Sequence, residues 1–218
     1  IPIEHKGLKL KLLVLDGSSL SQVKHDLHKS TDEAYEFCFK HPSPNTFSQL
    51  NNFDTRKGCS IVVFEPETNK THFVITLIYF PQTSAVEIYN VCKLQHSTLS
   101  AREIIGIIID QFCIDNPLFD SCKYIHLAML CESIYFFPAF ITYCKLGFRV
   151  DENRQSLSMR LPDHFTMSRP IINNHPIPPS RPEDEILKIN SGCMYTDQHI
   201  RLLENSIKNN KKEIKYPT

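Results

Sequence analysis

The stretch that decides the fold is Ala139 to Phe148, which reads AFITYCKLGF. Pro138 precedes it and can occupy the first turn of a helix, where its missing N–H donor costs nothing. The Lys-Leu-Gly-Phe end is typical of a helix that stops and leads into a strand, because Gly147 can adopt a left-handed backbone conformation. Phe148 would then anchor the returning chain in the core.

Strand and helix patterns extend from this segment in both directions. Strands are predicted over Gly7–Leu15, Cys59–Glu65, Thr71–Phe80, Ala85–Leu94, Lys123–Cys131, Phe148–Val150 and Ser156–Leu161, and helices over 19–40, 99–112 and 138–147. The second and third of these strands are joined by a short polar turn and form a hairpin, and the last two form another. The strand from Lys123 is short and apolar enough to be buried at the centre of a sheet.

The character of the chain changes after Leu161. Six of the 14 prolines fall between Pro162 and Pro182, which predicts an extended linker or a strap over the surface. Short amphipathic helices are predicted over about Glu183–Ile189 and Thr196–Ile207. We therefore expect a domain over residues 1–161 and a proline-rich linker with a helical extension over 162–218.

Composition excludes several classes of protein. The 218 residues are 41% hydrophobic with 24 Lys+Arg against 24 Asp+Glu, which excludes a disordered chain and a nucleic-acid coat. The Lys-rich run over 208–215 is expected to be a solvated end, so no nucleic acid is predicted as a partner. No stretch approaches the roughly 20 apolar residues that a membrane span requires, so no membrane is predicted either. The chain has only 6 glycines, so a function that depends on a glycine-rich binding loop is less expected.

The eight cysteines are spread singly, mostly inside apolar runs. This pattern favours buried, reduced thiols over a disulfide framework. We expect an intracellular reducing compartment, either cytoplasmic or nuclear, with the mitochondrial matrix as a further option. The start at Ile1, without an initiator methionine or a signal-peptide core, leads us to expect a processed or shortened chain.

One spacing raises the question of a metal. His25 and His28 are followed by Cys38 and His41, and two such pairs can supply four tetrahedral ligands. Both pairs, however, lie in predicted helix with no knuckle turn between them, so no metal site is expected.

The segment Ala139–Phe148 resembles the signature A-x-x-x-Y-x-K-L-G-F of the GNAT superfamily of N-acetyltransferases. The order of predicted elements over residues 7–161 is similar to that fold as well. The resemblance implies a mixed α/β fold with a mainly antiparallel central sheet flanked by helices, here followed by the proline-rich extension. It also implies acetyl-CoA, or another acyl-CoA, as a co-substrate.

GNAT proteins bind the CoA pyrophosphate with backbone N–H groups in a Q/R-x-x-G-x-G/A turn at a helix start. The matching window begins at Gln95, but Thr98 and Ser100 stand where glycines are expected. Their hydroxyls and that of Ser97 could bind phosphate, with Arg102 adding charge; alternatively, the hydroxyls only cap the helix. The residues that the resemblance assigns to the cofactor are Val91, Lys93, Gln95, Ser97, Thr98, Leu99, Ser100, Ala101, Arg102 and Tyr143.

The resemblance also assigns catalytic roles. Tyr143 matches the tyrosine that lies beside the thioester sulfur and can protonate the leaving thiolate, although it could equally be a core residue. An acyltransfer to an amine also needs a base, for which Glu87 on one predicted strand and Glu132 after the next are candidates, with His126 as a third choice.

The predicted function is transfer of an acetyl or other acyl group to a primary amine on a protein or a small molecule. The alternative is a catalytically inactive GNAT-like module that serves as a structural subunit of a larger assembly. The substituted loop favours the alternative, and so does Phe136, which replaces the asparagine that the family has three residues before the alanine. The extension over 162–218 could bind a protein partner.

Overall fold

The computed structural model describes residues 2–5, 7–15, 57–112, 120–130, 136–151, 164–171 and 177–190. The chain divides into two compact units, Ile1–Lys123 and Tyr124–Thr218. Each unit is described by itself. The helices predicted over 19–40 and over Thr196–Ile207 lie outside the described residues, as do the strand predicted over Ser156–Leu161 and the possible metal ligands His25, His28, Cys38 and His41.

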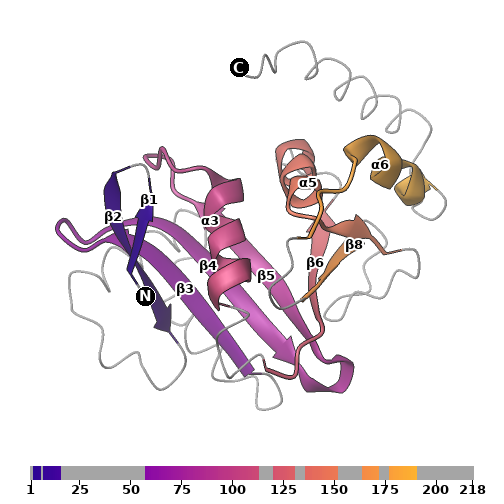
Figure 1. The fold of residues 1–218 in the computed structure, drawn as a ribbon, viewed down its shortest axis with the longest axis horizontal. Helices are drawn as coiled ribbons and strands as arrows, with labels where there is room; N and C mark the ends of the chain where they lie inside the picture. The colour runs from indigo at the N-terminus through magenta and orange to yellow at the C-terminus, as the bar shows by residue number, and fades with distance from the viewer. Residues whose placement is uncertain are drawn as a thin grey trace, which may run out of the picture. The chain divides into compact units, whose positions relative to one another are not determined.

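The first unit is built on an antiparallel sheet (Figure 1). Its described strands are β1 (Pro2–His5), β2 (Leu8–Leu15), β3 (Lys57–Glu65), β4 (Lys70–Phe80) and β5 (Ala85–Lys93). Each strand pairs with the next one in sequence, so the order in the sheet is β1-β2-β3-β4-β5. The predicted strand from Gly7, the hairpin and the strand from Ala85 are confirmed.

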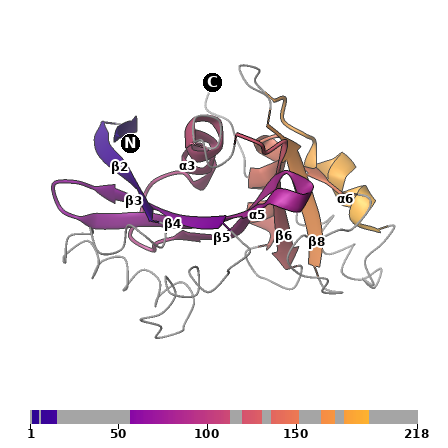
Figure 2. The same cartoon turned by 90° about the horizontal axis from the view of Figure 1, so that it is seen from below.

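Strand β4 pairs with both β3 and β5 and is buried along almost its whole length. From Thr71 to Phe80 every residue of the strand is buried, which its nearly continuous apolar sequence predicts. Helix α3 (Ala101–Ile107) and the π-helical turn η3 (Ile108–Phe112) follow β5. Figure 2 shows α3 lying over one face of the sheet. Ile104, Ile105 and Ile108 are buried, and together these two segments account for the helix predicted from Leu99.

Two β-bulges interrupt the strand pairing. Val63 pairs with Phe73 and Phe64 with Thr71, so His72 is the extra residue of β4. In the next pair of strands Thr76 pairs with Asn90 and Leu77 with Ile88, so Tyr89 is the extra residue of β5. Tyr89 is 44% exposed, whereas Val86, Glu87 and Ile88 are all buried. Because Val86, Glu87 and Ile88 are consecutive, both faces of this part of β5 are covered, and the bulge at Tyr89 shifts the register of the residues that follow.

The second unit contains antiparallel strands with helices beside them (Figure 1). Its described elements are β6 (Tyr124–Leu130), α5 (Phe136–Lys145), β7 (Arg149–Val150), β8 (His164–Pro170) and α6 (Pro182–Asn190). Strand β8 pairs with β6 on one side and with β7 on the other. The mixed, mainly antiparallel architecture, the strand from Lys123 and the helix from Glu183 are confirmed.

Strand β8 corrects the prediction of a linker after Leu161. The sequence from Pro162 onward is predicted as a linker, yet His164–Pro170 forms seven register pairs with β6. The reason is visible in the sequence: no proline lies between Pro162 and Pro170, so the intervening N–H groups can join a ladder. Phe165 and Met167 are buried on this strand, as its alternating pattern would allow. The division of the chain at residue 161 stays a prediction.

The cysteines agree only in part with the expectation of reduced thiols. Cys59, Cys122 and Cys144 are free and buried. Cys92 is disulfide-bonded, so the expectation is wrong for this residue. A single cysteine in an apolar strand predicts burial, which Cys92 shows, but it carries no information on the oxidation state.

None of the helices described is both long enough and apolar enough to cross a membrane.

Candidate functional site

The loop between β5 and α3 holds most of the residues predicted to bind the cofactor. It is pinned at its start, because Leu94 N donates to His72 O at 3.0 Å and Ser97 N donates to Leu94 O at 2.9 Å. The Lys93 ammonium donates to Leu99 O at 2.7 Å, which places a positive charge at the loop. Leu99 itself is only 2% exposed and anchors the loop in the core.

Helix α3 begins with a capping serine. Ser100 has extended backbone angles, and its hydroxyl oxygen accepts a hydrogen bond from Glu103 N, as an N-cap residue should. Ile104 N donates to Ser100 O at 3.1 Å, which closes the first turn. The Glu103 carboxylate lies 3.1 Å from His5 Nε2, so the helix start is also tied to β1.

Four backbone amides of this loop remain unused. Among the described residues, the N–H groups of Thr98, Ser100, Ala101 and Arg102 have no acceptor. Successive unpaired amides at the start of a helix form an environment that favours an anion, because each N–H carries a partial positive charge. The loop can therefore bind phosphate oxygens through its backbone, although Thr98 and Ser100 are not glycines.

The side chains of the loop differ in what they can contribute. The Ser97 side chain is buried, and its oxygen lies 3.1 Å from His72 Nδ1 and accepts from Leu99 N. Its hydroxyl therefore makes hydrogen bonds within the protein and is not available to a ligand. The other predicted cofactor residues of this unit are exposed, as Lys93, Gln95, Thr98 and Arg102 are, or half-buried, as Val91, Ser100 and Ala101 are.

Tyr143 lies on α5 in the second unit. Its side chain is 8% exposed and packs edge-to-face against Phe148, with ring centroids 5.3 Å apart. Burial raises the pKa of the phenol well above its usual value, so Tyr143 carries its proton at neutral pH. Such a phenol can donate a hydrogen bond or a proton but cannot act as a base.

The helix that carries Tyr143 ends as the sequence predicts. Phe148 N donates to Tyr143 O at 3.0 Å and Gly147 N to Cys144 O at 3.0 Å, which is the hydrogen-bond pattern of a Schellman motif. Gly147 has a φ of 85°. The motif fixes how the end of α5 leads into β7.

The candidate bases are in different surroundings. Glu87 is 3% exposed on β5, opposite Ile78 of β4, and Glu132 lies outside the described residues. His126 on β6 is part of a polar group that the sequence does not reveal. Its Nδ1 lies 3.6 Å from Asp151 Oδ2, and Ser168, which faces His126 across the sheet, donates its hydroxyl to Asp151 Oδ1.

The pKa of Asp151 reflects these contacts. Burial alone would raise the pKa of this carboxyl, but the neighbouring His126 imidazole and the hydrogen bond from Ser168 outweigh that effect, and the net pKa is lowered. Asp151 is therefore ionised at neutral pH, and its carboxylate lies beside Nδ1 of the imidazole. The arrangement is not a nucleophilic triad, because the serine hydroxyl bonds to the carboxylate rather than to the histidine.

The described structure thus groups Val91 to Arg102 around one loop of the first unit, and it places Tyr143 and His126 in the second. His72, Asp151 and Ser168 were missed because their partners are distant in the sequence and no local spacing connects them. No group of three or more His, Cys, Asp and Glu side chains suited to a metal is found within the described ranges.

No family model matches the sequence, and no curated protein sequence matches it either. Solved structures do resemble it. A probable acetyltransferase from Staphylococcus epidermidis ATCC 12228 is 14% identical and has a TM-score of 0.51, with 75% of this chain and 99% of that chain covered.

Two further similar structures have lower TM-scores. The ribosomal-protein-S18-alanine N-acetyltransferase from Escherichia coli is 10% identical with a TM-score of 0.47, covering 76% of this chain and 97% of that chain. The spermidine N-acetyltransferase from Vibrio cholerae, solved with CoA and spermine, is 15% identical with a TM-score of 0.44, covering 74% and 95%. The fold of this chain is GNAT-like, as the resemblance in the sequence predicts.

Proposed function

We propose that the protein is an acyltransferase that uses acetyl-CoA, or a related acyl-CoA, to acylate a primary amine. The observation that carries the proposal is that the amides of Thr98, Ser100, Ala101 and Arg102 have no acceptor within the described ranges. A fold alone does not define an activity. These amides, however, lie at the start of the helix that follows β5, where the CoA pyrophosphate would bind if the family pattern applies to this chain.

The loop suits a pyrophosphate without its glycines. Backbone N–H groups bind phosphate oxygens whatever the side chain, provided that the side chains point away from the ligand. Thr98 and Ser100 carry hydroxyls that can add hydrogen bonds, and the cations of Lys93 and Arg102 can balance the charge of the ligand. The Ser97 hydroxyl has no part in this scheme, because it is already bonded to His72.

The transfer itself needs no covalent enzyme intermediate. The amine nitrogen attacks the thioester carbonyl, the new N–C bond forms, and the C–S bond breaks to release the CoA thiolate. Tyr143 is the proposed proton donor to that thiolate, because it matches the tyrosine of the family signature and its phenol is protonated at neutral pH. A base takes the proton that the amine loses.

Two described residues are candidates for that base. His126 is about one-fifth exposed, and Asp151 beside its Nδ1 leaves Nε2 as the atom that accepts a proton. Glu87 is 3% exposed, which limits its contact with a substrate. These properties favour His126 over Glu87. The acceptor is proposed only as a class, a primary amine on a peptide, a polyamine or a small metabolite.

The direct test removes one amide without disturbing the helix. Ala101 is the first residue of α3, and Ser100 before it has the extended conformation that a following proline requires. We expect Ala101→Pro to fold normally and to bind acetyl-CoA about tenfold more weakly in calorimetric titration, because one N–H to a charged oxygen is lost. Ala101→Ser keeps the amide and is the matched control.

Turnover is tested by release of free CoA thiol in the presence of peptide amines and polyamines. Tyr143→Phe should lower kcat with little effect on the affinity for acetyl-CoA. Wild-type protein that gives neither heat nor thermal stabilisation with millimolar acetyl-CoA would contradict the proposal. That outcome would favour the alternative, an inactive GNAT-like module.

A further inference from the structure

A buried histidine lies beneath the loop of the proposed cofactor site. His72 is 3% exposed, and as the extra residue of a bulge in β4 its side chain is directed by the bulge rather than by the regular pleat. Both ring nitrogens have partners: Nε2 lies 2.8 Å from Glu65 Oε1, and Nδ1 lies 3.1 Å from Ser97 Oγ. The ring therefore connects the end of β3 to the loop.

The partners define where the protons are. An ionised Glu65 carboxylate can only accept, so Nε2 carries a hydrogen, and in the neutral imidazole Nδ1 then accepts from the Ser97 hydroxyl. Glu65 is kept ionised because hydrogen bonds, first from His72 and then from Thr68, lower its pKa. The Ser97 oxygen in turn accepts from Leu99 N at 3.3 Å. The result is a relay of hydrogen bonds from Leu99 through Ser97 and His72 to Glu65.

The relay acts on the conformation of the loop. It engages the amide of Leu99 and fixes Ser97 inward, so that Thr98 between them stays exposed, and its amide has no acceptor in the described part of the chain. A second contact reinforces it: His96 Nε2 donates to Thr71 O at 2.8 Å, and the His96 ring packs edge-to-face against His72 at 5.6 Å.

We propose that His72, through Ser97, is a positioning residue that holds the loop over residues 95–100 in the conformation that binds the acyl-CoA pyrophosphate. The proposal rests on the proposed function, since it concerns the same site. His72 does not contact the ligand in this scheme, because both of its ring nitrogens are engaged within the protein. It affects binding by keeping the loop ordered before the ligand arrives.

Two substitutions separate the bonds that His72 makes. His72→Asn places an amide oxygen near the position of Nδ1, so the bond from Ser97 can persist while the bond to Glu65 is lost. His72→Gln places an N–H near the position of Nε2, so the bond to Glu65 can persist while the bond from Ser97 is lost. Only the first variant should preserve the loop. Thr68→Ala removes the other partner of Glu65, an exposed hydroxyl at 2.9 Å, and is the control.

The first measurement needs no ligand. Amide hydrogen exchange of Ser97 and Leu99 should be about tenfold faster in His72→Gln than in wild type, and within about threefold of wild type in His72→Asn and Thr68→Ala. Ser97→Ala, which leaves His72 in place, should accelerate exchange at Leu99 as His72→Gln does. Unchanged exchange in both His72→Gln and Ser97→Ala would overturn the proposal, even if one of them folds poorly.

The second measurement is calorimetric titration with acetyl-CoA. His72→Gln and Ser97→Ala should bind about tenfold more weakly, with His72→Asn close to wild type. If the wild-type protein does not bind acetyl-CoA, the proposed function fails, while hydrogen exchange still decides whether His72 positions the loop. If exchange is accelerated but affinity is unchanged, the role of His72 in binding is overturned and the proposed function stands.

Discussion

Gly147 is the residue on which the end of α5 depends most directly. Its φ of 85° is strained for any residue with a side chain, and an added Cβ would lie 2.6 Å from Ile177 Cγ2 and 3.2 Å from Pro178 O. We expect Gly147→Ala to lower the free energy of unfolding by about 2 kcal/mol or more, since left-handed strain alone costs about 1–2 kcal/mol. Urea denaturation measures the change.

Gly7 provides the control for this prediction. Its φ is 79°, but nothing lies within 4 Å of the position where a Cβ would be added. Gly7→Ala therefore carries the backbone strain without the steric clash, and it should cost about 1 kcal/mol. Equal losses in the two variants would show that contact with Ile177 adds nothing.

Asp151 makes stability depend on pH. Because its pKa in the folded protein is lowered, the carboxylate contributes stability above the unfolded pKa of about 3.9, and this contribution is lost as pH falls through the folded pKa. Asp151→Asn should lower the free energy of unfolding at pH 7 by about 1 kcal/mol. Below about pH 4 the difference from wild type should shrink. A loss that stays constant from pH 7 to pH 3 would contradict this account.

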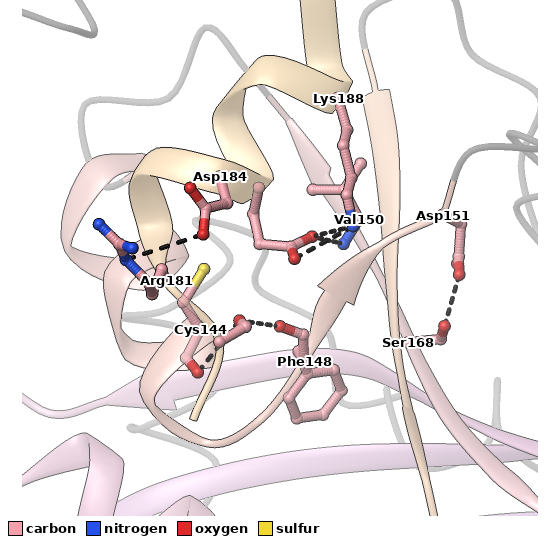
Figure 3. Close-up of polar contacts among 10 residues, drawn as sticks. Cys144, Phe148, Val150, Asp151, Ser168, Arg181, Asp184 and Lys188 are labelled. Carbon is pink, nitrogen blue, oxygen red and sulfur yellow. Dashed lines mark hydrogen bonds and ion pairs between the residues drawn. The ribbon is translucent and has the colours of Figure 1, made fainter. Parts of the chain in front are cut away.

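Among the elements, α6 shows how a segment beyond the predicted domain is held. Its Glu185 is 4% exposed, and its carboxylate accepts from Val150 N of β7 at 2.7 Å and from Lys188 Nζ at 3.2 Å (Figure 3). Ahead of α6, Ser180 N and its hydroxyl donate to Cys144 O, and the hydroxyl also reaches Phe148 O. Residues 177–190 thus lie across the turn between α5 and β7.

The carboxylate of Glu185 is the contact to test. Glu185→Ala leaves the buried Val150 N–H without an acceptor and should lower the free energy of unfolding by about 1–3 kcal/mol in urea denaturation. Glu185→Gln keeps an acceptor oxygen and should lose less. Asp184, one residue earlier, pairs with Arg181 at 3.7 Å on the surface, and Asp184→Ala should change stability by less than about 0.5 kcal/mol. Matching losses at the two positions would contradict the role assigned to Glu185.

The elements that the sequence predicts well are those whose pattern is local. The continuous apolar run of β4 and the Gly147 stop signal are recognisable without any partner. The bulges at His72 and Tyr89 are not, because a bulge exists only in the register between two strands. Strand β8 was obscured by the prolines around it, although its own residues alternate between buried Phe165 and Met167 and more polar neighbours.

The same distinction applies to the candidate site. Ser100 as a helix cap follows from local chemistry, and the structure shows it capping α3. That Ser97 is unavailable to a ligand depends on His72, 25 residues earlier in the chain. Asp151 and His126 likewise meet only through β8, which pairs with both β6 and β7. Contacts made by tertiary pairing have no signature in a single sequence.

At the scale of the whole molecule, the scarcity of glycine has a limited consequence. The chain has 6 glycines, and a left-handed conformation is observed at Gly147, where the fold needs it. The loop before α3 has none, yet among the described residues no acceptor is found for its amides at Thr98, Ser100, Ala101 and Arg102. A helix start supplies N–H groups irrespective of side chain, so the loss of glycine changes how closely a phosphate can approach rather than whether donors exist.

Buried thiols report the integrity of each unit: Cys59 is 0% exposed in the first and Cys144 is 0% exposed in the second. Burial raises the pKa of Cys144 to about 12, so at pH 8 only about 1 in 10,000 of these groups is the reactive thiolate. We expect a maleimide to label both residues about 100-fold more slowly in native protein than in urea-unfolded protein. Peptide mass spectrometry resolves the two sites. Labelling of either cysteine at its unfolded rate would mean that its unit does not hold the packing described.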